Sequence, residues 1–160
     1  MDRAETVVWL HTDRERPSRA HELLSTGFNL VQVSDSVAVD GLRRFHLWST
    51  SSASDAALQL AAEGPERLET LVLEAPSSAD ETLLSQIKVP TLVIFGTRDP
   101  RSTTGRIYRE KMTTCQFVLV YDAGQDVSVD RPEAFSSLVA DFLNRRDAFI
   151  VNQRSTLINP

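Results

Sequence analysis

The chain has 160 residues, of which 22 are acidic and 17 are basic, and its formal net charge is −5 at pH 7. This length suits one domain with a sizeable core, and the negative charge argues against a nucleic-acid binder, because phosphate neutralisation needs a basic face. The single cysteine, Cys115, excludes an intramolecular disulfide and a multi-cysteine metal site, and we expect its thiol to be buried. We see no apolar leader and no run of membrane-spanning length, so we expect a cytoplasmic protein without a membrane partner.

Short apolar runs alternate with segments of helical spacing along the chain. Runs without polar alternation, separated by helices, are typical of a parallel sheet that is covered on both faces. We therefore predict an α/β fold, a three-layer α/β/α sandwich, in which Trp9 and Trp48 are core anchors of adjacent strands. The predicted strands cover residues 6–10, 28–33, 45–48, 71–73, 91–95 and 117–120.

Prolines, glycines and capping residues mark the helices between these runs. We expect helices over residues 17–25, 54–63 and, more loosely, 77–86. Ser78 and Asp80 are the candidate caps of the third helix, and Asp130 is interpreted as the N-cap of a final amphipathic helix.

One domain is expected over residues 1–145, followed by a C-terminal tail over 146–160. The tail is polar apart from one apolar triplet, at 149–151. It either extends along the body of the domain or covers a neighbouring subunit, so a homo-oligomer is one possibility.

The stretch from His46 to Ala62 combines a strand, a tight turn and a helix. Large apolar side chains give way abruptly to five small residues, with Ser51 in the middle. At such a turn one side chain is pushed out above the sheet, and the residues two positions to either side must be small, as Ser49 and Ala53 are. The alternative is that a serine-rich tract simply caps the helix.

These residues resemble the nucleophile elbow of the α/β-hydrolase family, Gly-x-Ser-x-Gly, with Ser49 and Ala53 in place of the glycines. Three further segments resemble the family in the same order. Residues 56–76 look like the helix, turn and strand after the elbow, 87–99 like the strand and loop that carry the acid, and 120–143 like the histidine segment and the closing helix. The resemblance covers residues 6 to about 145.

The resemblance implies a six-stranded parallel sheet with the order 2-1-3-4-5-6 and no cap domain. Many members insert a cap where this chain has only some 15 residues, between Leu73 and Val89, and the first two strands of the family have no counterpart here. In open parallel sheets, ligands bind beyond the carboxyl ends of the strands where the strand order reverses. Ser51 and the loop 11–16 are expected at that point.

The family's catalytic triad carries over only in part. The resemblance places Ser51 at the nucleophile position and Asp99 at the acid position, whereas Gln125 occupies the position of the catalytic histidine. Glutamine has no titrating group and cannot take and return a proton. Its amide could hydrogen-bond both Ser51 and Asp99, which would keep the geometry and abolish the base, so we expect no ordinary triad catalysis.

Three residues are candidates for binding an oxyanion or a ligand. His11 and Thr12 match the family's His-Gly oxyanion segment, and Ser52 offers its backbone N–H at the start of a helix. The candidates for a replacement base are His11, Asp122 and Asp126. The other two histidines, His21 and His46, are expected in structural or solvent-exposed roles.

Three interpretations remain open from the sequence. The first is a pseudo-hydrolase that binds a small apolar or acyl-bearing molecule, and the second is an active esterase-like hydrolase with a non-standard base. The third is a non-catalytic scaffold whose site is covered by a second copy. No metal or cofactor is expected, because the histidines are scattered and no Gly-x-Gly-x-x-Gly follows the first strand.

Overall fold

Six parallel strands form one sheet in the computed structural model, which describes residues 4–12, 16–77 and 80–150. The order of the strands is β2-β1-β3-β4-β5-β6, and every neighbouring pair is parallel. The predicted sheet and its order are therefore confirmed. The strands are β1 (Thr6–Leu10), β2 (Asn29–Val33), β3 (Phe45–Thr50), β4 (Leu68–Glu74), β5 (Thr91–Gly96) and β6 (Cys115–Val120).

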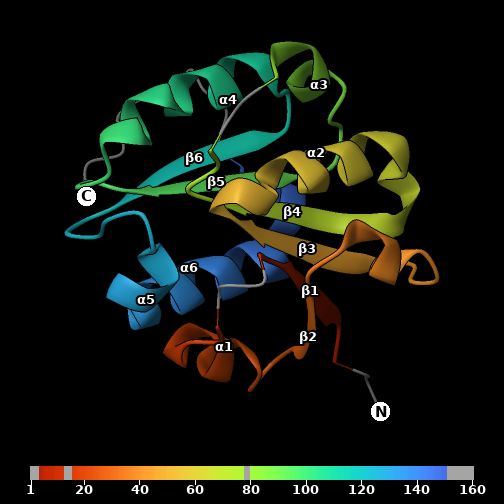
Figure 1. Cartoon of the computed structure of the whole chain (residues 1–160), viewed down its shortest axis with the longest axis horizontal. Coiled ribbons are helices and arrows are strands. Elements are labelled where there is room, and N and C mark those ends of the chain that lie inside the picture. Colours follow the sequence, from red (N-terminus) through yellow and green to blue (C-terminus); the bar gives the residue numbers. More distant parts are fainter. Residues whose placement is uncertain (1–3, 13–15, 78–79, 151–160) are drawn as a thin grey trace.

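Helices cover both faces of the sheet, as Figure 1 shows. One layer holds α2 (Ser54–Glu63), α3 (Glu81–Ser85) and α4 (Gly105–Lys111), and the other holds α1 (Arg19–Leu24), α5 (Val127–Asp130) and α6 (Pro132–Arg145). A separate apolar core fills each interface between helices and sheet. Trp9 and Trp48 are both buried in the core beneath α6, with ring centroids 5.5 Å apart, as predicted for core anchors.

Short 3-10 turns connect several of these elements: η1 (Ser36–Val39), η2 (Ser51–Ala53), η3 (Pro65–Arg67), η4 (Pro100–Thr104) and η5 (Arg146–Phe149). The connection from β4 to β5 spans residues 75–90 and contains the five-residue helix α3, so it is far too short for a cap domain. Asp80 caps α3 as predicted, because its carboxylate accepts from the backbone N–H groups of Thr82 and Leu83 at 3.0 and 3.2 Å. Ser78, the other candidate, lies outside the described residues.

The prediction for Asp130 is wrong. Asp130 ends α5, and its carboxylate accepts from the backbone N–H of Gly124 at 2.8 Å. Helix α6 begins two residues later, at Pro132, with Arg131 in the cap position. A short helix before the proline therefore places the aspartate where it stabilises a loop instead of a helix end.

Strand β4 begins three residues earlier than its apolar run, because polar side chains at its start find partners across the sheet. Thr70 lies beside His46, and the Thr70 hydroxyl and His46 Nδ1 are 2.7 Å apart. Glu69 pairs with Arg44, with Oε1 and Nε 2.6 Å apart. His46 is fully buried, so the predicted structural role fits it.

The chain beyond residue 145 continues on the domain as η5. The Arg146 guanidinium bonds the carboxylates of Glu5 and Glu69, and the Phe149 ring packs against Phe142 at 5.4 Å. The remainder of the expected tail, 151–160, lies outside the described residues. In the described part of the chain, no helix has the length and apolar character needed to span a membrane.

Candidate active site

Ser51 occupies the turn between β3 and the helix that follows it. Its φ is 41°, in the left-handed region that residues with a Cβ rarely adopt. The flanking Ser49, in β3, and Ala53, in η2, are both buried, which favours small side chains at these two positions. The carbonyl of Ser51 accepts from the backbone N–H groups of Ser54 and Ser77, which ties the turn to α2 and to the end of β4.

Gln125 reaches Ser51 from the loop between β6 and α5. Its side-chain Nε2 donates to Ser51 Oγ at 2.9 Å, although the two residues are 74 positions apart in the chain. The structure thus brings together the serine and the residue that stands where a histidine base was expected.

Asp99 does not complete this contact. Its buried carboxylate accepts from the Arg101 backbone N–H at 2.9 Å, and the Arg101 guanidinium lies 3.3 Å away from Oδ2. Within the described residues, no hydrogen bond joins Asp99 to Gln125, so the bridging amide considered from the sequence is not formed. The physical reason is local, since Asp99 is the N-cap of η4 and the residue two positions on supplies both a backbone and a side-chain donor.

Two loops beyond β5 and β6 interlock beside the site. The backbone N–H of Arg98 donates to the carbonyl of Ala123 at 2.9 Å, and that of Asp122 donates to the Thr97 hydroxyl at 2.9 Å. A Cβ on Gly96 would overlap the backbone carbonyl of Ala123, so the two loops approach this closely only because residue 96 is glycine. This packing fixes the loop that carries Gln125.

The exposed Arg98 guanidinium also contacts the loop that carries Gln125. Its Nε lies 3.2 Å from Asp122 Oδ1, and its Nη2 lies 3.9 Å from Asp130 Oδ2, which also accepts from Gly124. Asp122 and Asp126 were the acidic candidates for a replacement base. Asp122 serves in this clamp, and Asp126 occupies the residue before α5.

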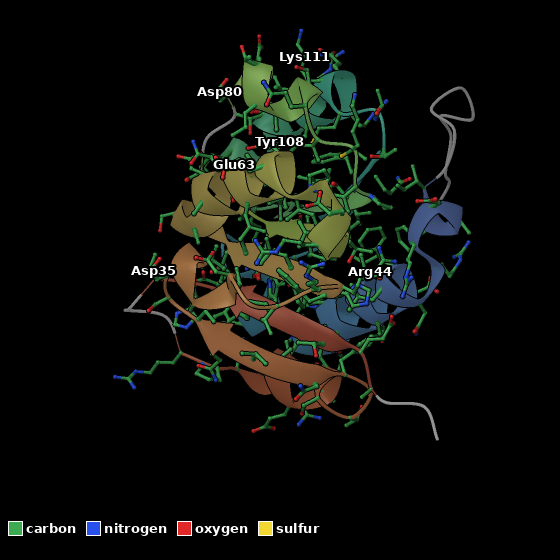
Figure 2. All side chains as sticks on the ribbon, turned by 90° about the vertical axis from the view of Figure 1, so that its right-hand side faces the viewer. Asp35, Arg44, Glu63, Asp80, Tyr108 and Lys111 are labelled. Atoms are coloured by element: carbon green, nitrogen blue, oxygen red, sulfur yellow. The ribbon has the colours of Figure 1, made fainter. Side chains whose placement is uncertain are left out.

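The three predicted oxyanion or ligand residues line one hollow of about 390 Å³. His11, Thr12 and Ser52 share its wall with Leu10, Ser34, Asp35, Ala53 and Ala56. The hollow lies at the carboxyl ends of β1 and β2 and against η2, where the strand order reverses, as expected for a ligand site in an open parallel sheet. In Figure 2, Asp35 marks this end of the sheet and Arg44 marks the opposite one.

Ring stacking and a short local contact orient His11. Its ring stacks on Trp9 with centroids 4.1 Å apart, and its Nδ1 lies 2.5 Å from the carbonyl oxygen of Thr12. His21 packs against the same indole, where burial lowers the pKa of the imidazole to about 4, and its Nδ1 accepts from the Ser18 backbone N–H at 2.8 Å. Cys115 is buried as predicted, and burial raises the pKa of its thiol to about 12.

Sequence reasoning missed Glu74, the last residue of β4. Its side chain is only 2% exposed, and it accepts from Trp48 Nε1 at 3.0 Å and from the Ser128 backbone N–H at 2.8 Å. Burial raises the pKa of this carboxyl to about 7. One signal could have found it, namely an acidic residue directly after the apolar run of a central strand, where side chains at the carboxyl end are enclosed.

No His, Cys, Asp or Glu side chains within residues 4–12, 16–77 and 80–150 form a group of three or more that could hold a metal ion.

Comparison with known proteins identifies the fold. No protein-family model matches the sequence, and no curated protein matches it. Solved structures do match along most of the chain. The enol-lactonase of Burkholderia xenovorans has a TM-score of 0.78 at 16% identity, covering 89% of this chain and 92% of its own. Carboxylesterase CesB of Bacillus subtilis has a TM-score of 0.73 at 15% identity, covering 88% and 84%.

A third match is MGS-MChE2, an α/β-hydrolase enzyme from the metagenome of lagoon sediments at Mar Chica, Morocco. It has a TM-score of 0.76 at 15% identity, covering 89% of this chain and 92% of its own. This chain has the α/β-hydrolase fold. Identities this low show the fold alone, because one fold carries many functions and activity depends on the residues of the site. In this example of the α/β-hydrolase fold, the residues that the sequence assigned to the triad positions are Ser51, Asp99 and Gln125.

Proposed function

We propose that this α/β-hydrolase-fold chain is a pseudo-hydrolase that binds a small acyl-bearing or apolar molecule at Ser51 and in the adjoining hollow. The observation that carries the proposal is the hydrogen bond from Gln125 Nε2 to Ser51 Oγ at 2.9 Å. A serine nucleophile needs a neighbour that accepts its proton and later returns it. A glutamine amide has no titrating group in either orientation, so Ser51 has a hydrogen-bond partner and no base there.

The left-handed turn at Ser51 supports the interpretation of this residue as the apex of a nucleophile elbow. Backbone strain of order 1–3 kcal/mol persists only where the surrounding structure enforces it, and it clusters at functional sites. A serine that merely capped a helix would adopt an ordinary extended conformation, as Ser18 does before α1. The turn is therefore better explained by an inherited site than by capping.

The engagement of Asp99 with Arg101 supports the loss of catalysis independently of Gln125. An orienting acid must face the base, and this carboxylate faces a guanidinium 3.3 Å away. Loss of triad members typically costs several powers of ten in rate, about 10⁴ for the acid alone. The residues at the base and acid positions, Gln125 and Asp99, are thus both unsuited to activating Ser51.

The lining of the hollow suggests the chemistry of the ligand. Leu10, Ala53 and Ala56 present apolar surface, while Ser52 lies at the amino end of η2 and α2, where backbone N–H groups favour a carbonyl oxygen. The carboxylate of Asp35 disfavours an anionic ligand. A neutral molecule with one carbonyl group and a short apolar chain fits this combination.

The first experiment compares hydrolysis of p-nitrophenyl acetate and butyrate by the wild type, Ser51→Ala and Gln125→His. We expect the wild type to match Ser51→Ala and Gln125→His to gain turnover that disappears in the double variant with Ser51→Ala. If the wild type clearly exceeds Ser51→Ala, the chain is an active hydrolase, and the search for its base begins at His11.

The second experiment tests binding by thermal shift with short-chain esters and amides. Ala56→Trp fills the hollow from the exposed side of α2, and Ala134→Trp, on the exposed side of α6, is the matched control. We expect at least one neutral carbonyl compound to raise the Tm of the wild type and of Ala134→Trp, and not of Ala56→Trp. Shifts that persist in Ala56→Trp would place binding elsewhere. A blank screen with an oligomeric protein would favour the scaffold interpretation.

A further inference from the structure

Glu74 links the same two segments that meet at Ser51 and Gln125. One of its donors, Trp48, lies three residues before Ser51 on β3, and the other, Ser128, lies three residues after Gln125 in α5. In the sheet, Glu74 is the register partner of Thr50, the residue immediately before Ser51. A second cross-link, fully buried, therefore runs parallel to the exposed one between Gln125 and Ser51.

The two donors of this cross-link favour an ionised carboxylate. Trp48 Nε1 and the Ser128 backbone N–H are both donors, and an ionised carboxylate accepts from both. A glutamine would turn its NH₂ group toward one of these donors, and a protonated acid would leave one donor facing a hydroxyl oxygen, which is a weaker acceptor. The short helix α5 would then lose its bond to β4 or shift away from it, and the loop before α5 would move with it.

Burial of the ionised Glu74 carboxylate is unfavourable in free energy. Within the described residues, no cation forms an ion pair with Glu74, and a buried charge without a counter-ion is unfavourable by several kcal/mol. The charged residue that acts on Glu74 is Asp126, just before α5, and its negative charge raises the pKa of Glu74 further. An apolar residue would fill this core position more favourably, so stability alone does not explain the glutamate.

We propose that Glu74 is a positioning residue, whose carboxylate holds the start of α5 against β3 and thereby keeps the Gln125 amide on Ser51. This inference rests on the proposed role of the Ser51–Gln125 pair. It implies that the pair is ordered at pH values where Glu74 is ionised and loosened where Glu74 is protonated. The placement of the site residues is then pH-dependent close to neutrality.

The test follows the side-chain NH₂ signals of Gln125 in ¹H–¹⁵N spectra between pH 5 and pH 8, without any ligand. The signals are assigned by their loss in Gln125→Ala, and Ser51→Ala supplies their position when the bond to the hydroxyl is absent. We expect the wild-type signals to move toward the Ser51→Ala position as the pH falls, with a midpoint near 7. In Glu74→Gln, the Gln125 signals should lie near the position seen in Ser51→Ala at every pH.

Three controls make the result decisive. Glu110→Gln removes an exposed carboxylate on α4 and should behave as the wild type, and the exposed Gln59 side chain is an internal reference. His11 also lies on this side of the sheet, so the titration is repeated in His11→Asn, where the transition should persist. Wild-type signals without a transition, a transition that vanishes in His11→Asn, or Glu74→Gln signals that follow the wild-type curve would each overturn the proposal.

If circular dichroism shows that Glu74→Gln is unfolded, the wild-type titration and Glu74→Asp decide instead. The shorter carboxylate should retain a transition, at a shifted midpoint. Because no ligand is used, a blank ligand screen would contradict the proposed function and leave this result unchanged.

Discussion

Asp99 and Arg101 form an ion pair between residues only two positions apart, with Oδ2 and Nη2 separated by 3.3 Å. The aspartate is nearly buried and the arginine is partly exposed, and the Arg101 backbone N–H donates to the same carboxylate at 2.9 Å. The carboxylate that the sequence resemblance assigned to the acid position is therefore held by its own loop, and it faces a cation instead of residue 125.

This pairing limits what a restored histidine can achieve. We expect Gln125→His alone to show weak Ser51-dependent esterase activity, because Asp99 remains engaged. Adding Arg101→Gln should raise that activity by at least about 10-fold, since an orienting acid is worth up to ~10⁴ in serine proteases. Steady-state hydrolysis of p-nitrophenyl butyrate measures this, and Arg106→Gln, an exposed arginine on α4, is the matched control. Equal rates with and without Arg101 would show that Asp99 cannot serve as the acid.

Glu74 makes stability depend on pH in a direction opposite to that of most carboxylates. Its folded-state pKa, about 7, lies above the ordinary value of 4.5, so the folded state binds the extra proton between these values. The contribution of protonated Glu74 to the free energy of unfolding is fully present below pH 4.5 and is lost as the pH rises through 7. It amounts to about 3 kcal/mol. The free energy of unfolding of Glu74→Gln, measured in urea, should therefore rise relative to the wild type by about that amount between pH 4.5 and pH 7.5. A constant difference would contradict the raised pKa.

His21 makes the stability of the fold depend on pH in the opposite direction. Burial lowers its pKa from 6.5 to about 4, so the unfolded chain binds the extra proton between these values. The stability contributed by neutral His21 is present above pH 6.5 and is lost as the pH falls through 4. His21→Gln should therefore gain stability relative to the wild type as the pH falls over this range. Urea unfolding measures the difference, and an increasing relative loss at low pH would contradict the assignment.

Gly96 permits the close approach of the two loops beside the site. In Gly96→Ala the new Cβ overlaps backbone atoms of Ala123 and Gly124, which cannot move aside as a flexible side chain can. We expect a loss of about 2–4 kcal/mol in the free energy of unfolding. Gly27→Ala is the matched control, because nothing lies within 4 Å of a Cβ there, and its effect should stay within about 0.5 kcal/mol. Similar effects at both positions would show that the loops are not packed as described.

The left-handed conformation of Ser51 can be tested by comparing Ser51→Gly with Ser51→Ala. Both variants lose the hydroxyl and its bond to Gln125, but only glycine adopts a φ of 41° without strain. We expect Ser51→Gly to be more stable than Ser51→Ala by up to about 1 kcal/mol in thermal or urea unfolding. Equal stabilities, or a more stable Ser51→Ala, would contradict the left-handed conformation of residue 51.

The fold was predictable from the sequence because its evidence is local. Continuous apolar runs and capping residues identify buried strands and helix ends within windows of a few residues, and α2 has the predicted bounds. The turn at Ser51 could be predicted in the same way, from the small residues around it. The start of β4, where the polar Glu69 and Thr70 enter the sheet, escaped this reasoning, and the short helices α4 and α5 were not predicted either.

The partners of the site residues were decided by the tertiary structure. The sequence by itself predicted the strands and their succession, and its family resemblance assigned glutamine to the position of the base. It did not determine that Asp99 turns to Arg101, that Asp130 holds Gly124 instead of capping a helix, or that Glu74 is buried between β3 and α5. The physical reason is that donors both near and remote in the chain compete for each of these carboxylates, and the backbone geometry and desolvation that decide between them are not recorded in a local pattern of side chains.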